Sequence, residues 1–85
     1  MRSFTYTIKD ELGIHARPAG MLAKAAKAMD SEITITKGDK SVSAVRLMAL
    51  MGLGIKCGDT ITVAVNGGNE MLNERTIKGF LEANL

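Results

Sequence analysis

The alternation of apolar and polar residues in four short segments constrains the fold of this chain more than any other feature. Successive side chains of a β-strand point to opposite faces, so strict alternation predicts a strand with one buried face. Most of these segments are also rich in threonine, valine and isoleucine, which favour strands. Their apolar positions are Phe4, Tyr6 and Ile8; Ile33 and Ile35; Val42 and Ala44; and Ile61, Val63 and Val65.

The residues between these segments follow the helical period instead. Residues 16–29 carry apolar side chains at spacings of three and four, and Pro18 suits a first helical turn, which needs no amide hydrogen there. A short second helix is predicted over residues 46–51, because two glycines follow it, and a third begins after the N-cap residue Asn69. The apolar faces of the first and third helices are Ala19, Leu22, Ala23, Ala26 and Met29, and Ile77, Phe80, Leu81 and Leu85.

Two local features refine these predictions. The run Lys37-Gly38-Asp39-Lys40 predicts a two-residue hairpin turn of type II′, since glycine comes first. Glu74 interrupts the apolar face of the third helix, and a buried carboxylate there would be costly. We therefore expect this helix to begin loosely or to leave its first turn exposed.

The resulting order is βαββαβα. Each strand presents one apolar face, and three helices are available to cover those faces. The sequence therefore predicts an α+β fold, an open-faced two-layer sandwich with a four-stranded antiparallel sheet covered on one face by three helices. With 85 residues and no linker or repeat, residues 1–85 are expected to form a single domain.

Composition excludes several classes of function. The formal charge is only +2, and aromatic residues make up 4% of the chain with no tryptophan, which argues against a nucleic-acid partner. Cys57 is the only cysteine, so neither a disulfide framework nor a cysteine-based metal site is expected. The N-terminus lacks an apolar signal segment, and the longest apolar stretch, residues 47–55, is too short to span a membrane. We expect a cytoplasmic protein with no metal and no cofactor.

The candidate functional residue is His15, the only histidine. It lies where a polar loop leads into the first helix, so the free N–H groups of Ala16 and Arg17 are expected to point at any group on the imidazole. Histidine can act as a nucleophile without a separate base, and arginine binds phosphate oxygens with its planar fork. Taken alone, a single surface histidine is more often without function, but these neighbours favour a site for a phosphoryl group.

The residues around His15 resemble the active-site signature of HPr, the histidine-containing phosphocarrier family of the bacterial phosphoenolpyruvate-dependent sugar phosphotransferase system. The resemblance rests on Gly13-Ile14-His15-Ala16-Arg17-Pro18-Ala19 and on a second segment, Arg46-Leu47-Met48-Ala49-Leu50-Met51-Gly52-Leu53-Gly54-Ile55. It covers nearly the whole chain at matching length and element order. It implies that His15 accepts a phosphoryl group on Nδ1 from enzyme I and donates it to an enzyme IIA domain, with Arg17 neutralising the phosphoryl oxygens. The chain would then be a carrier, most simply a monomer, rather than a stand-alone enzyme.

A second surface is expected to meet these partners. Basic residues of the first helix lie opposite its apolar face, although most helices have a solvated charged face of this kind. The short helix has more apolar side chains than a small core can bury, so some should be exposed, whereas core packing accounts better for Leu50. By resemblance, the partner-binding residues are Gly20, Lys24, Lys27, Leu47, Met48 and Met51.

One position departs from the family pattern. In many Gram-positive relatives a serine that is phosphorylated by a dedicated kinase opens the second helix, and here that position is Arg46. Arginine cannot accept this modification, so the serine-based switch is expected to be absent. Two alternatives remain open: a carrier for a nitrogen-related or dihydroxyacetone branch, and a regulatory binding module that carries no phosphate. Against the module, relatives of that kind tend to lose the histidine and retain the serine.

Overall fold

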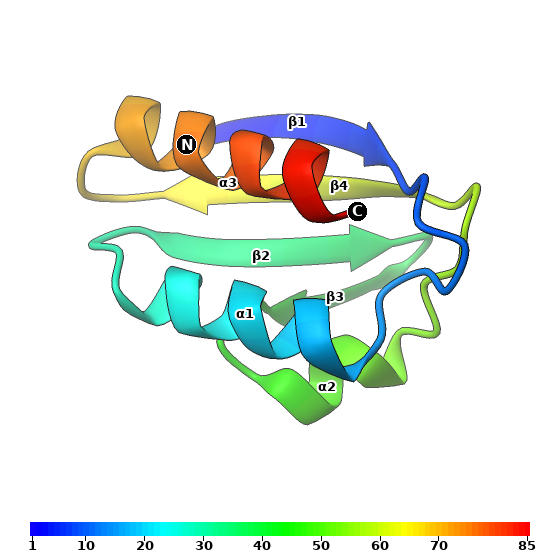
Figure 1. The fold of residues 1–85 in the computed structure, drawn as a ribbon. Helices are drawn as coiled ribbons and strands as arrows, with labels where there is room; N and C mark the ends of the chain where they lie inside the picture. The colour runs from blue at the N-terminus through cyan, green and yellow to red at the C-terminus, as the bar shows by residue number, and fades with distance from the viewer.

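A computed structural model describes residues 1–85 and confirms the βαββαβα order (Figure 1). The strands are β1 (Arg2–Thr7), β2 (Glu32–Lys37), β3 (Lys40–Ser43) and β4 (Thr60–Asn66). The helices are α1 (Ala16–Lys27), α2 (Leu47–Gly52) and α3 (Glu70–Asn84). None of the three combines the length and the apolar character that crossing a bilayer requires.

The four strands form one antiparallel sheet in the order β1-β4-β2-β3. Val63 of the central strand β4 lies opposite Phe4 of β1 and Ile35 of β2, so the apolar rows of three strands meet on one face. The neighbouring residue Thr62 lies opposite Thr5 and Thr36, and this row belongs to the other face. The alternation in the sequence therefore becomes an apolar inner face and a hydroxyl-bearing outer face.

All three helices cover the inner face, which confirms the open-faced two-layer sandwich (Figure 1). The core is a single cluster that combines the inner rows of the sheet with Leu22 of α1, Leu50 of α2 and Ile77 of α3, none of which is exposed. The N-terminal end of α1 and the C-terminal end of α3 lie at the same end of the sheet (Figure 1). This arrangement brings residues that are far apart in the sequence to one edge of the molecule.

Several boundaries differ from the predicted ones by a few residues. Ile8 and Ala44 are buried but lie just beyond the ends of β1 and β3. The first helix ends at Lys27, and the N–H of the next residue, Ala28, is shared between two carbonyl groups of the last turn, as is common at helix ends. The predicted hairpin turn is confirmed: Gly38 has a φ of +61° and Asp39 has no positive φ, as a type II′ turn requires.

Glu74 does not loosen the start of α3, so the second of the two expected outcomes, an exposed first turn, is the one that the structure has. The Asn69 side chain accepts a hydrogen bond from the N–H of Leu72 and caps the helix. Glu74 is only half-buried and its carboxylate is paired with the Arg2 guanidinium at 3.1 Å, which lowers the cost expected for an isolated buried carboxylate. The first turn is exposed, as expected, at Met71 and Leu72.

A polar network joins the connection that follows α1 to the start of α3. The Asn73 amide, which is buried, donates to Asp30 Oδ1 and to Ser31 Oγ at 2.7 Å each. Ser31 donates in turn to the carbonyl oxygen of Gly67, and Asp30 also accepts from the N–H of Asn69. The hydrogen bonds that the Asp30 carboxylate accepts, the largest from the Asn73 amide and the next from the N–H of Asn69, lower the pKa of Asp30.

Candidate functional site

His15 is the N-cap residue of α1, as the sequence predicts. Its backbone is extended and its side chain makes no capping hydrogen bond, so the imidazole is free to react, with 36% of the side chain exposed. The first helical hydrogen bond runs from the N–H of Ala19 to the His15 carbonyl oxygen. The N–H groups of Ala16 and Arg17 therefore have no acceptor within the chain. Both lie at the positive end of the helix dipole, where an anion is stabilised.

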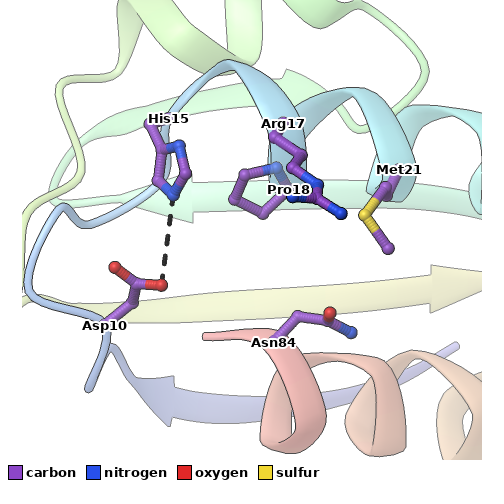
Figure 2. Close-up of a pocket in the computed structure, with 6 residues that line it drawn as sticks. All are labelled: Asp10, His15, Arg17, Pro18, Met21 and Asn84. Carbon is purple, nitrogen blue, oxygen red and sulfur yellow. Dashed lines mark ion pairs between the residues drawn. The ribbon is translucent and has the colours of Figure 1, made fainter.

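His15 opens onto a depression at the end of the sheet where α1 begins and α3 finishes (Figure 2). Its volume is about 210 Å³, which is below the range of about 300–1,000 Å³ that is common for small-molecule sites. A group the size of a phosphoryl fits this space and stays accessible from solution. The residues that line the depression are Asp10, His15, Arg17, Pro18, Met21 and Asn84.

Arg17 is the cationic residue of the depression. Its side chain is exposed, and its guanidinium makes no ion pair or hydrogen bond with the rest of the chain. In Figure 2 it extends from the first turn of α1 past Pro18 on the side of Met21, so it lines the same depression as His15 without touching the imidazole. An arginine with all five donors free is well suited to bind an anionic group with two parallel hydrogen bonds.

The loop before His15 is held in place by its backbone. Gly13 is buried, has a φ of +66° and packs directly against the Ile55 carbonyl group. A Cβ atom at this position would also lie 2.7 Å from Cα of Lys56, so no other residue fits without a shift of the backbone. The N–H of Ile14 donates to the Ile55 carbonyl oxygen at 3.1 Å, which fixes the chain just ahead of His15.

Asp10 belongs to the site although the sequence did not point to it. Its Oδ2 atom lies 4.0 Å from Nε2 of His15, on the side of the ring away from α1 (Figure 2). The N–H of Asp10 donates to the main-chain oxygen of Leu85 at 2.9 Å, which ties the loop to the end of α3. The sequence did not indicate Asn84 either, because only the tertiary fold brings the end of α3 close to the start of α1. A carboxylate five residues before the histidine was the one available signal.

The residues expected to meet partners lie on neighbouring surfaces of α1 and α2. Arg17, Lys24 and Lys27 are exposed along α1, and Gly20 is half-buried among them. On α2, Leu50 is fully buried, whereas Met48 is 79% exposed and Leu47 and Met51 are each 38% exposed. We call the set Gly20, Lys24, Lys27, Leu47, Met48 and Met51 the docking face. Arg46 is exposed at the N-cap of α2, and its side chain makes no capping bond.

The fold and the site together define a class. A small sandwich presents one accessible histidine at a helix N-terminus, on a depression that a free arginine also lines and near exposed apolar and basic side chains, an arrangement that can hold an anionic group in reach of solvent. Comparison with known families gives the same result. The model described as "PTS HPr component phosphorylation site" matches residues 2–83. The chain belongs to this family, the HPr phosphocarriers of the sugar-transporting phosphotransferase system.

Individual relatives agree with this assignment. The chain is 38% identical over 85 residues to the phosphocarrier protein HPr of Mycoplasma genitalium, covering 99% of this chain and 97% of that protein. It is 39% identical over 69 residues to HPr of Mycoplasma capricolum, covering 81% of this chain and 78% of that protein. Among solved structures, a mycoplasma histidine-containing phosphocarrier protein superposes with a TM-score of 0.92 at 34% identity, covering 96% and 93% of the two chains.

Proposed function

We propose that His15 is the phosphoryl-carrying residue of this protein, accepting the group on Nδ1 from a phosphohistidine of enzyme I and donating it to a histidine of an enzyme IIA domain. The observation that carries the proposal is the position of the uncapped imidazole at the N-terminus of α1, on a depression that the unpaired Arg17 side chain also lines. Family membership supports the phosphocarrier role, and the geometry around His15 supports the choice of residue.

The transfer needs no metal or cofactor from this chain. The lone pair on Nδ1 attacks phosphorus while the bond from phosphorus to the donor histidine breaks, and the donor nitrogen keeps that electron pair. Negative charge on the equatorial oxygens is stabilised by the Arg17 guanidinium and by the N–H groups of Ala16 and Arg17. The same groups hold the phosphoryl until an acceptor histidine attacks from the open side. Both partners must approach His15 in line with the bond that breaks, and the shallow depression leaves room for that approach.

The docking face is proposed to bind enzyme I and enzyme IIA in turn. Exposed methionine and leucine side chains adapt to different apolar surfaces, and the basic residues of α1 select acidic ones. Because one face serves both partners, they must bind one after the other. This mode of action suits a monomeric carrier in the cytoplasm, and the monomeric state and the cytoplasmic location are parts of the proposal.

The direct test is phosphoryl transfer from phosphoenolpyruvate in the presence of magnesium and enzyme I. We expect an acid-labile, base-stable adduct on the wild-type chain and none on a His15→Ala variant. Arg17→Ala should fold normally and accept the group more slowly by about 10- to 100-fold, since a hydrogen bond to a charged group contributes about 1.5–3 kcal/mol. An unlabelled wild-type chain, or a labelled His15→Ala chain, contradicts the proposal. Parallel assays with donors of the nitrogen-related and dihydroxyacetone branches identify the branch served.

We also propose that this carrier lacks the serine-based regulatory switch. The position that opens α2 is Arg46, which has no hydroxyl to phosphorylate. Incubation with the serine kinase of a Gram-positive relative and radiolabelled ATP should leave the wild-type chain unlabelled, whereas Arg46→Ser should become labelled. Formation of phosphoserine on the wild-type chain would overturn the proposal.

A further inference from the structure

The acidic residue beside His15 is not explained by phosphoryl binding. Figure 2 shows the Asp10 carboxylate on the Nε2 side of the imidazole. The distance from Nε2 of His15 to Oδ2 of Asp10 is 4.0 Å. A negative charge in a depression that holds an anion is unfavourable unless it serves another group. The only cationic side chain that lines the depression is Arg17, and Asp10 forms no ion pair with it. The carboxylate is therefore directed at the imidazole.

Asp10 is also held firmly in this position. Its Oδ1 atom accepts a hydrogen bond from the N–H of Leu12 at 2.8 Å, which leaves Oδ2 facing His15. Its carbonyl oxygen accepts from the N–H of Gly13 at 2.9 Å, and its own N–H donates to Leu85. Backbone bonds on both sides and a side-chain bond thus fix the direction of the carboxylate before any ligand arrives.

The chemistry of an imidazole nucleophile gives this carboxylate a role. One ring nitrogen can attack only if the proton lies on the other, and a proton on Nε2 is stabilised by the nearby carboxylate. As the bond from Nδ1 to phosphorus forms, the ring acquires a positive charge that it shares with the Nε2–H group. A fixed carboxylate on the Nε2 side stabilises that charge, as the aspartate of a catalytic triad stabilises its imidazolium.

We infer that Asp10 is a positioning residue for His15: it holds the ring proton on Nε2, leaves Nδ1 free for phosphorus, and balances the charge of the phosphorylated ring. The part that concerns the phosphorylated ring rests on the proposed function. The part that concerns the tautomer of the free imidazole does not depend on the proposed function. The inference also accounts for the link between the Asp10 loop and the end of α3, because that link fixes the carboxylate relative to the histidine.

The test compares the wild-type chain with Asp10→Asn and a matched control, Glu11→Gln. Asparagine keeps an oxygen that accepts from the N–H of Leu12, so the variant removes the charge with little change to the loop. Glu11 is the next residue, is exposed and has no ion pair with His15, so its variant removes the same charge without the proposed contact. The readouts are the ratio of the two neutral tautomers of His15, from nitrogen-15 shifts of the ring, and the rate of phosphoryl uptake from enzyme I.

In Asp10→Asn we expect the preference for the Nε2–H tautomer and the rate of uptake each to fall by about two- to fivefold, the range for a partly exposed charge pair. Both losses should shrink as salt is added, and Glu11→Gln should match the wild type. Equal behaviour of the two variants overturns the inference. A slower rate with an unchanged tautomer ratio also overturns it, because Asp10 would then act through partner docking. If the wild-type chain takes up no phosphoryl group, the proposed function fails, and the tautomer ratio still decides whether Asp10 positions the ring.

Discussion

Replacing Gly13 by alanine should destabilise the protein more than its small change in size suggests. An L-residue at a φ of +66° costs about 1–2 kcal/mol. The added Cβ would also collide with the Ile55 carbonyl group and lie 2.7 Å from Cα of Lys56, and both are backbone atoms that cannot rotate away. Overpacking of this kind adds about 1–3 kcal/mol. The expected total is about 2–5 kcal/mol, a large share of the roughly 5–15 kcal/mol that stabilises a domain.

The matched control is Gly54→Ala. Gly54 has a φ of +63°, but nothing lies within 4 Å of the position that its Cβ would occupy, so only the conformational cost applies. At about 4–8 °C of Tm for each kcal/mol in a domain of this size, calorimetry should show a loss of roughly 8–40 °C for Gly13→Ala and of roughly 4–16 °C for Gly54→Ala. Urea denaturation provides a second measurement. Equal losses in the two variants would refute the argument that close backbone contact, rather than the positive φ alone, requires glycine at residue 13.

Three further predictions concern the polar network, acid stability and the docking face. Asn73→Ala removes the donor that satisfies two oxygens of the network, so the free energy of unfolding in urea should fall by about 1–3 kcal/mol; an unchanged midpoint would contradict this. Folding lowers the pKa values of Asp30 and Asp59. The main cause is the Asn73 amide for Asp30 and the N–H of Lys56 for Asp59. The unfolded chain therefore binds more protons in acid, so urea stability should be level above about pH 5 and fall below about pH 4, with a flatter fall in Asp30→Asn. Met48→Glu should slow transfer with enzyme I by about tenfold or more at unchanged Tm, whereas Met71→Glu, also exposed but on α3, should have no effect on either quantity.

The order of the elements was predictable because local patterns determine it. The two hydrophobic periods separate strands from helices, and Pro18 and Asn69 mark helix starts by properties of single residues. His15 and the first-turn residues beside it were predictable for the same reason, since local sequence determines their arrangement. The neighbours of His15 in the sequence are also its neighbours in space, because a helix N-terminus collects its own first-turn groups.

The remaining features depend on contacts between distant parts of the chain. Glu74 looked unfavourable on its helix because its partner Arg2 is 72 positions away. The loop that carries Asp10 is anchored to the end of α3, and this contact between distant parts of the chain helps to place the carboxylate opposite His15. The strand order of the sheet was not predicted either, since alternation shows that a segment is a strand but does not show which strand lies beside it.

The central place of β4 in the sheet has a consequence for synthesis of the chain. Both β1 and β2 form their ladders with β4, and β1 has no other neighbour. While a ribosome makes the first 59 residues, β1 therefore has no strand to pair with, and the long separation between β1 and β4 in the sequence slows their pairing. The depression around His15 is therefore expected to form only with the sheet, and a nascent or truncated chain that lacks β4 should not present the proposed phosphoryl site in its folded form.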